Sequence, residues 1–272
     1  MTTSKYDLFE PNPINRIHKE GTEKYSVLEG MLLKYGWLET RPMIVGPKKN
    51  NGKHTIIVGH NRFRIAVKHG LPVRFQIEEK IQDIYVFEGP GGQPTWSLAD
   101  WVHSRARSNE NPAYRKLLEF QERTGITTSD CICLFSIGSA MGNSVNEIRN
   151  GTFKIENSDH AEAVGSLVTY CSSLDIPYST KSAFVRALSQ IVKTKVVDVE
   201  ELAKRIRKNI GIMKRKYFVP NYLGILTEAY NYRSTPKIDL ATEVRNALDA
   251  ERAKHAAQAR KGTGAAKNNR AA

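Results

Sequence analysis

The chain has few cysteines, and it has no apolar run long enough to cross a bilayer. Its 272 residues include only Cys131, Cys133 and Cys171, an odd number that fits no disulfide framework of a secreted protein. Cys131 and Cys133 lie in an apolar run without a second cysteine pair or a suitably spaced histidine pair, so we expect buried thiols and no metal site. Residues 1–7 contain no apolar signal segment. We therefore expect a cytoplasmic protein without a membrane partner.

Acidic residues are scarce relative to basic ones. The sequence contains 41 Lys and Arg against 28 Asp and Glu, which gives a formal net charge of +13. Such an excess is typical of proteins that neutralise nucleic-acid phosphates and release their counterions. A chain of this length favours two or three small units, each with a modest core.

The most informative local pattern is an apolar, β-branched run that ends at a glycine and passes at once into a short basic helix. The run covers residues 55–58, the glycine is Gly59, and the helix continues to His69. We expect Asn61 to cap this helix and Gly70 to end it in the left-handed conformation. Backbone N–H groups at such a turn favour an anion. The pattern indicates a phosphate site, with arginines on a solvated helix face as the alternative.

Two segments carry a resemblance to a known family. Gly59–Ala66 resembles the G-E-R-R-x-R-A-A box of the ParB/sulfiredoxin-like domain, and is nearer still to the G-H-x-R form of stand-alone and phage members. Gly36–Gly46, at the right distance upstream, resembles the family's G-L-x-x-P-I-x-V segment. A helix over 25–35, a strand opened by Pro42, a hairpin at 48–53, and then strand, helix and strand follow the order of that domain.

This resemblance implies a phage- or plasmid-type ParB-like protein of α+β class. Residues 1–90 would form a small ParB/sulfiredoxin-like α/β domain, and the rest would be mostly α-helical. A Gly/Pro cluster at residues 89–94 indicates the boundary. Beyond it we expect a helical unit over 94–157 with a helix-turn-helix outline, a basic helical domain over 158–250, and a disordered basic tail over 251–272.

The residues assigned to the phosphate or nucleotide site are Gly59, His60, Asn61, Arg62 and Arg64. Arg62 is the first choice for direct contact because it matches the arginine that the family retains, and Arg64 is the second. His60 would add a neutral donor, a switchable charge or a general acid/base.

Departures from the family pattern narrow the expected chemistry. Sulfiredoxins carry a reactive cysteine where this chain has His60, so sulfinic-acid repair is excluded. Partition ParB proteins follow the domain with an E-N-x-Q-R segment that helps to hold CTP and magnesium, and residues 77–85 do not match it. The cofactor therefore stays open between a nucleoside triphosphate with Mg²⁺ and none. The nearest acids for a two-metal nuclease site are Glu78, Glu79 and Asp83.

The helical region contains a pair of tryptophans and a series of short helices. We expect Ser97 to cap a helix in which Trp96 and Trp101 pack into the core rather than stack on a base. Short helices with glycine-bearing turns over residues 112–149 have the outline of a helix-turn-helix. A helical linker domain that never touches DNA is the alternative.

The last region contains a concentrated basic stretch at the end of a helix expected over residues 198–212. Basic side chains beside Tyr217 and Phe218 suit a phosphate backbone with occasional stacking. A cationic helix end with a solvated face is the alternative. The residues predicted to contact DNA are Lys204, Arg205, Arg207, Lys208, Lys214, Arg215 and Lys216.

Together these patterns predict a ParB-like DNA-binding protein whose phosphate turn acts as a nucleotide switch. One alternative is an enzyme on the same fold, either a nuclease or a nucleoside triphosphatase. A second alternative is a protein-binding regulator whose charge serves solubility. The expected partners are DNA and a nucleotide, and the assembly state is open, with a homodimer as one candidate.

Overall fold

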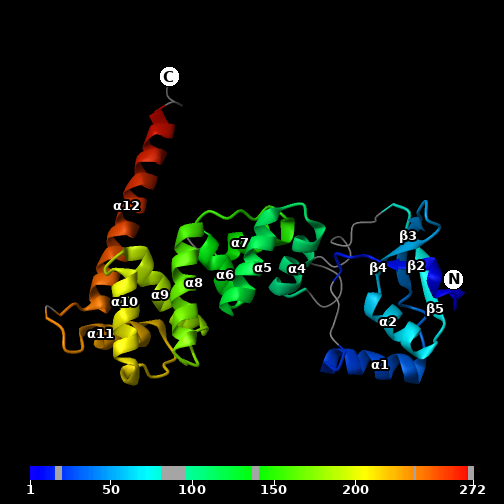
Figure 1. Cartoon of the computed structure of the whole chain (residues 1–272). Coiled ribbons are helices and arrows are strands. Elements are labelled where there is room, and N and C mark those ends of the chain that lie inside the picture. The colour runs from blue at the N-terminus through cyan, green and yellow to red at the C-terminus, as the bar shows by residue number, and fades with distance from the viewer. Residues whose placement is uncertain (16–19, 81–95, 137–140, 236, 269–272) are drawn as a thin grey trace. The chain divides into compact units, whose positions relative to one another are not determined.

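The computed structural model describes residues 1–15, 20–80, 96–136, 141–235 and 237–268 (Figure 1). It divides into two compact units, Met1–Arg115 and Lys116–Ala272. The first unit contains a small sheet with helices, and the described part of the second is helical. The predicted α+β class is therefore confirmed.

The first unit is built on a five-stranded sheet with the order β1-β5-β3-β4-β2. Its strands are β1 (Thr2–Thr3), β2 (Phe9–Pro11), β3 (Met43–Lys48), β4 (His54–Val58) and β5 (Val73–Ile77). β3 and β4 form an antiparallel hairpin, while β5 runs parallel to β3, β2 parallel to β4, and β1 antiparallel to β5. Ile44 pairs with Val58, so the beginning of β3 lies beside the end of β4.

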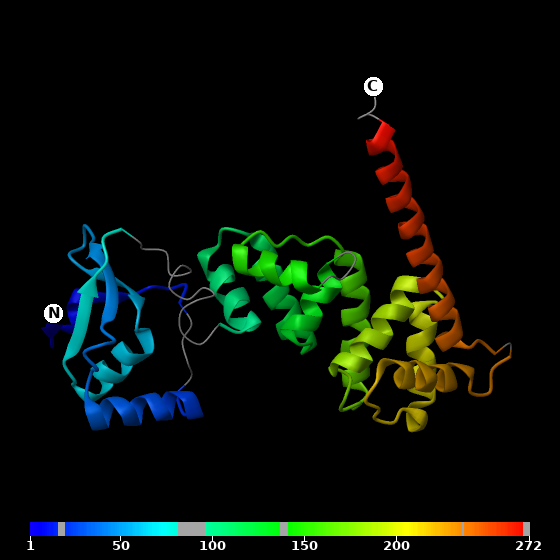
Figure 2. The same ribbon diagram turned by 180° about the vertical axis from the view of Figure 1, so that it is seen from behind.

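Helices α1 (Glu23–Tyr35) and α2 (His60–His69) complete this sheet domain, with a 3₁₀ turn η1 (Tyr6–Leu8). α2 packs on β3 and α1 packs on α2 (Figures 1 and 2). The predicted order of helix, strand, hairpin, strand, helix and strand is confirmed. The core between α2 and the sheet consists of Phe9, Met43, Val45, Ile56, Phe63, Ala66, Val73 and Phe75.

The apolar stripe expected on α1 differs from the face that is buried. The apolar spacing over residues 25–35 predicts a stripe of Val27, Leu28, Met31, Leu32 and Tyr35. The structure buries Tyr25 and Leu32 against Ile65 of α2, with Leu28 packed beside them, and leaves Val27, Met31 and Tyr35 exposed. Two apolar ridges lie side by side on this helix, and α2 covers only one of them.

Helix α4 (Leu98–Ser108) begins as predicted. Ser97 forms a capping box with Asp100: Ser97 Oγ accepts from Asp100 N at 3.2 Å, and Asp100 Oδ2 accepts from Ser97 N at 2.8 Å. Trp96 and Trp101 are both buried, with ring centroids 4.9 Å apart. Their large faces therefore pack in the core, as expected.

Hydrogen bonds join α4 to the segment after β2 in the first unit. Arg107 Nη1 donates to the carbonyl of Asn15 at 3.0 Å, and Ser104 Oγ donates to the carbonyl of Ile14. The division between the compact units falls inside α5, after Arg115. The boundary expected at residues 89–94 lies outside the described residues.

The second unit contains the remaining helices. They are α5 (Pro112–Thr124, which crosses the division), α6 (Thr128–Phe135), α7 (Met141–Asn150), α8 (Ser158–Ser173), α9 (Ser182–Thr194), α10 (Val199–Lys208), η2 (Ile210–Ile212), α11 (Val219–Asn231) and α12 (Leu240–Asn268). α9 packs against α8, α11 and α12, and α10 packs against α8 and α11. The apolar spacing of α9 predicts a buried stripe, and the structure buries all of its members: Phe184, Val185, Leu188, Ile191 and Val192.

α12 continues to Asn268 and so includes most of residues 251–272, the segment that the sequence predicts to be a disordered basic tail (Figure 2). Leu240 and Val244 are buried and anchor the first turns. Helix propagation from an anchored start adds a hydrogen bond with each residue, and the Ala, Lys, Arg and Gln content of the segment favours it. Neither α12 nor any other described helix combines the length and apolarity that a membrane span requires.

The cysteines of the second unit are free thiols. Cys131 and Cys171 are buried, and burial raises the pKa of each to about 12. Both therefore stay protonated and unreactive near neutral pH, as expected for cysteines that pack as small apolar residues.

The contact of α8 with α5 depends on Gly165. A Cβ at this position would lie 2.6 Å from Phe120 Cε2, and the Phe120 ring is itself held against Phe135 with centroids 4.9 Å apart. Gly165→Ala should therefore lower the free energy of unfolding by about 1–3 kcal/mol through overpacking. Gly224→Ala on α11, which meets nothing within 4 Å, is the matched control and should gain up to about 1 kcal/mol. Chemical denaturation that showed equal shifts for the two variants would contradict this packing.

Candidate functional site

The predicted phosphate turn is present and is centred on Gly59. Gly59 has φ 106° and ψ 13°, which is the left-handed region, and a Cβ there would lie 3.2 Å from Met43 Cγ. Glycine is required for both reasons. Gly59 itself is the N-cap, since its carbonyl accepts from Phe63 N at 2.9 Å. The expectation that Asn61 caps the helix is wrong, because the sharp turn lets α2 begin two residues earlier.

His60 is buried and is bonded to the chain segment after β2. Its side chain is 4% exposed; Nε2 accepts from the backbone N of Asn12 at 2.9 Å, and Nδ1 contacts the Asn15 amide. A neutral ring that accepts at Nε2 carries its proton on Nδ1. Burial lowers the pKa of His60 from 6.5 to about 4, so the ring is neutral at physiological pH. These contacts fasten residues 12–15 to the turn, and burial disfavours the charged form of the ring. The switchable charge and the general acid/base role of His60 stay predictions.

Arg62 is held in place at the start of α2. Its Nη1 donates to the carbonyl of Arg41, and its guanidinium lies over the Trp37 ring at 5.2 Å from the centroid. Trp37 Nε1 donates to the same carbonyl at 2.8 Å. One backbone oxygen thus fixes both side chains, and the stack restricts the guanidinium further.

Within the described residues the charge of Arg62 has no acidic counterpart. Burial and the nearby Arg41 hold the pKa of Arg62 below its ordinary value. Among the described residues no carboxylate forms an ion pair with it, whereas Arg64 and Arg74 each have one. Two neighbouring guanidinium groups without an acid are the arrangement that an anion would stabilise.

Arg64 does not join this group. It forms an ion pair with Glu20 at 3.1 Å and lies over the Tyr25 ring at 5.9 Å. Successive helical residues differ by about 100°, so residues two apart face almost opposite directions. The structure therefore brings together Gly59, Arg62 and the half-buried Asn61 at the helix start, and directs Arg64 toward α1.

Sequence reasoning missed Trp37 and Arg41. The signal was available in the predicted hairpin: in an antiparallel pair, the residues that precede the first strand lie beside the residues that follow the second. The segment before β3 therefore lies next to the turn after β4, which the pairing of Ile44 with Val58 confirms.

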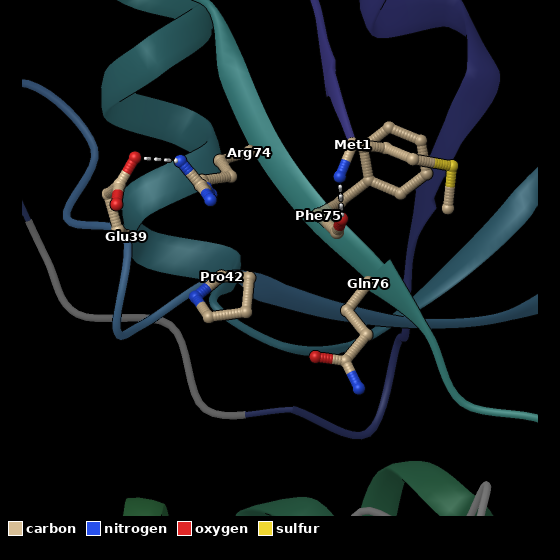
Figure 3. A pocket seen from close by; sticks show the side chains of 6 residues that line it. All are labelled: Met1, Glu39, Pro42, Arg74, Phe75 and Gln76. Atoms are coloured by element: carbon tan, nitrogen blue, oxygen red, sulfur yellow. Dashed lines mark hydrogen bonds and ion pairs between the residues drawn. The ribbon is translucent and has the colours of Figure 1, made fainter.

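A hollow of about 240 Å³ in the first unit lies apart from the predicted turn residues. Figure 3 shows its lining, which consists of Met1, Glu39, Pro42, Arg74, Phe75 and Gln76. Its charged groups are already engaged, since Arg74 Nη1 binds Glu39 Oε1 at 2.8 Å and the Met1 amine donates to the carbonyl of Phe75 at 3.0 Å. The hollow is therefore a weaker anion site than Arg62.

The acids considered for a nuclease site do not assemble within the described structure. Glu78 and Glu79 follow β5, and Asp83 lies outside the described residues. In the ranges that the structure describes, no three His, Cys, Asp or Glu side chains gather closely enough to hold a metal ion.

The predicted DNA-contacting residues begin on α10, which has two distinct faces. Leu202 and Ile206 are buried, whereas Lys204, Arg207 and Lys208 are exposed. The spacing of three and four residues places those three cations together on the face opposite the core. Asp198 caps the helix by accepting from Glu201 N at 2.9 Å.

Arg205 is the exception on this helix. Its Nε binds Glu201 Oε1 at 2.6 Å, and its guanidinium lies over the Tyr230 ring at 5.7 Å. It therefore joins α10 to α11 and is a structural residue.

The second basic group follows η2 directly, in the segment that leads to α11. Lys214 and Arg215 are exposed and Lys216 is half-buried. No carboxylate of the described chain forms an ion pair with any of these three or with the three exposed cations of α10. We call Lys204, Arg207, Lys208, Lys214, Arg215 and Lys216 the basic surface.

No protein-family model and no curated protein matches this chain. Among solved structures it is similar to the C-terminally truncated chromosome-partitioning protein ParB from Caulobacter crescentus complexed with CTP-gamma-S: the identity is 16%, the match covers 76% of this chain and 97% of that chain, and the TM-score is 0.29. It is also similar to that protein complexed to the centromeric parS site, with 15% identity, 79% and 94% coverage, and a TM-score of 0.33. Because both TM-scores are below 0.5, we base the function on this chain's own residues.

The lowered pKa of His60 predicts how the stability of the fold depends on pH. Its pKa is about 4 in the folded state and 6.5 in the unfolded state, so between these values the unfolded chain binds more protons. The free energy of unfolding should therefore fall by up to about 3 kcal/mol as the pH is lowered from 6.5 to 4, because each pKa unit corresponds to 1.36 kcal/mol. His60→Gln should be less stable at pH 7.5 but lose less over this window.

Urea denaturation at several pH values between 7.5 and 4 measures this effect. His103→Gln, which changes an exposed histidine of the same unit, is the control and should retain the wild-type slope. An unchanged slope in His60→Gln would show that His60 is not the group responsible.

Proposed function

We propose that this protein binds DNA through the basic surface of its second unit. The observation that carries the proposal is that six of the seven predicted cations are without an acidic partner in the described chain, while Arg205 alone is paired. A solvated helix face in a stable protein commonly intersperses both signs of charge. Here Lys204, Arg207 and Lys208 gather on the exposed side of α10, and further cations follow in the next segment. Glu200 in the first turn is exposed on the same side, but within the described chain it forms no ion pair with these cations.

The energetics of such a surface favour a polyanion. Each lysine or arginine that neutralises a phosphate releases condensed counterions, and this release supplies much of the binding free energy. The side chains are also long and unpaired, so no internal ion pair has to break before a phosphate binds.

Helices α6 and α7 are a second candidate contact region. α6 is capped by Thr127, whose side chain accepts from Asp130 N, and it is buried along most of its length. α7 follows it and exposes Asn146, Arg149 and Asn150 on the side away from buried Ile148. A buried first helix followed by a polar, exposed second helix is the division of roles in a helix-turn-helix, and we assign α7 the reading role. Residues 137–140 of the connection lie outside the described residues.

A second proposed activity is the binding of a phosphate-bearing ligand at the start of α2. It is supported by the held guanidinium of Arg62, the nearby Arg41, and the helix N-terminus that begins at Gly59. Asn61 belongs to the same first turn. A nucleoside triphosphate is the ligand class to test, with and without Mg²⁺.

Removing the charge of the segment before α11 should weaken DNA binding. For the triple variant Lys214→Ala, Arg215→Ala and Lys216→Ala, we expect weaker binding to duplex DNA and a flatter plot of log affinity against log salt concentration. The slope should fall by up to about 3, because each phosphate contact contributes about 0.9. Fluorescence anisotropy between low and high salt measures both quantities.

The control for this experiment must lose the same net charge. Lys5→Ala, Lys24→Ala and Lys53→Ala together remove three exposed lysines of the first unit. This control should keep most of the affinity if position matters. Equal losses in both triple variants would mean that net charge alone attracts DNA, and binding by wild type that ignores salt would contradict the proposal outright.

Arg62→Ala tests the anion site. We expect affinity for nucleoside triphosphate to fall about tenfold or more, as for loss of a charge-assisted contact. The melting temperature should fall only by what the loss of one hydrogen bond to the Arg41 carbonyl and of the Trp37 stack causes. Arg64→Ala is the matched control: it breaks an internal pair with Glu20 and should leave affinity unchanged. Calorimetry and thermal unfolding on the same preparations distinguish the two. Unaltered affinity in a destabilised Arg62→Ala protein would remove Arg62 from the site.

A further inference from the structure

The segment that leads into α11 exposes two adjacent aromatic rings. Tyr217 is 75% exposed and Phe218 is 70% exposed, and no other aromatic side chain in the described residues is as open. Single exposed apolar residues are normal on a protein surface. Two consecutive rings left in water are unusual, because aromatic side chains are the largest apolar groups that folding can bury.

Phe218 also occupies a position where another residue type would stabilise the fold. It is the N-cap of α11, with an extended backbone (φ −122°, ψ 150°) and no side-chain hydrogen bond to the first turn. Ser, Thr, Asp and Asn are preferred at this position because their oxygen accepts from a free backbone N–H. Phe218 thus neither buries its apolar ring nor caps the helix with a side-chain oxygen. A residue that stabilises the fold in neither way indicates a role in binding a partner.

The charge around the rings identifies the partner. Lys214, Arg215 and Lys216 come directly before them, and the Arg215 guanidinium lies over the Tyr217 ring at 5.6 Å from its centroid. Cations that follow a phosphate backbone, combined with flat rings that stack on bases, form the surface that binds single-stranded nucleic acid. A purely apolar protein partner would leave the three cations without a counterpart.

We propose that Tyr217 and Phe218 stack on unpaired bases, so that the basic surface prefers single-stranded or locally opened nucleic acid to closed duplex. This inference rests on the nucleic-acid binding proposed above and adds the state of the bases to it. In a closed duplex the bases stack on one another, and the rings could engage them only by wedging a base step apart. The cations can contact the phosphates of either form.

Two full-length proteins are compared, the wild type and the double variant Tyr217→Ala/Phe218→Ala. Each is titrated into labelled 20-nucleotide probes at one salt concentration, and binding is measured by fluorescence anisotropy. The probes are a DNA single strand, its duplex, the duplex with an unpaired bulge, and the matching RNA strand, which separates the two sources of unpaired bases. We expect the double variant to lose about tenfold or more on single-stranded and bulged probes. On closed duplex it should change less than about threefold, with an unaltered salt slope because no charge is removed.

The matched control is Tyr232→Ala, which removes another exposed tyrosine of the same unit that also has an arginine over its ring, Arg233 at 5.3 Å. It should bind every probe as wild type does. Phe218→Ser separates binding from folding: a serine cap should raise the melting temperature while single-strand affinity falls. A lowered melting temperature with unchanged single-strand affinity would overturn the proposal, because Phe218 would then act within the fold.

The failures of the two proposals are distinguishable. If the triple variant of Lys214, Arg215 and Lys216 weakens duplex binding while the double aromatic variant binds all probes like wild type, the basic surface stands and the stacking inference fails. If wild type binds no probe at any salt, both fail. If the double variant instead dissociates an oligomer in light scattering and retains its affinity for all probes, the rings belong to a protein interface and the stacking inference is wrong.

Discussion

The close approach of Gly59 to β3 is the constraint on which the whole first-unit site depends. The left-handed turn brings the backbone within contact distance of Met43, and any side chain at residue 59 would strain the turn and push the strand away. Because β4 ends there and β3 begins beside it, the same turn brings the segment before β3 next to the first residues of α2. His60 then fastens the chain after β2 to this point, and Arg62 rests on the carbonyl of Arg41. A local backbone requirement thus assembles three distant segments.

The second unit reaches its proposed function by a different route. α10 must bury Leu202 and Ile206 against neighbouring helices, and a helix that buries one face necessarily presents the other. Glu201 neutralises the one arginine that lies at the edge of the packed face, and Lys204, Arg207 and Lys208 are exposed to water. The contacts that hold α10 are apolar packing, the Asp198 cap and the Arg205 contacts, and none of them uses these three exposed cations. Beyond the helix, Tyr217 and Phe218 are likewise exposed to solvent and take no part in the core.

The prediction from sequence succeeded where a single local rule decides the outcome. Ser97 caps its helix, Gly70 ends α2 in the left-handed conformation, and the α9 stripe is buried. It failed where two local rules compete. Asn61 is a favourable cap, yet the turn at Gly59 started the helix earlier, and the long apolar pattern of α1 contained two ridges of which only one met a partner. At the alanine-rich end of α12, a high helix propensity competes in the same way with a composition that has little to bury.

The order of elements, the α+β class and the concentration of positive charge follow from the sequence, because periodicity, turn chemistry and composition are properties of neighbouring residues. The roles of individual charged residues do not. Arg62 and Arg64 look equivalent in the motif, and so do Arg205 and Arg207. Within the part of the chain that the structure describes, one arginine of each pair forms an ion pair with a carboxylate and the other does not. His60 looks like a titrating group until burial makes it neutral. Only the tertiary structure decided these cases, since the partner and the solvent exposure of a side chain are set by segments far away in the chain.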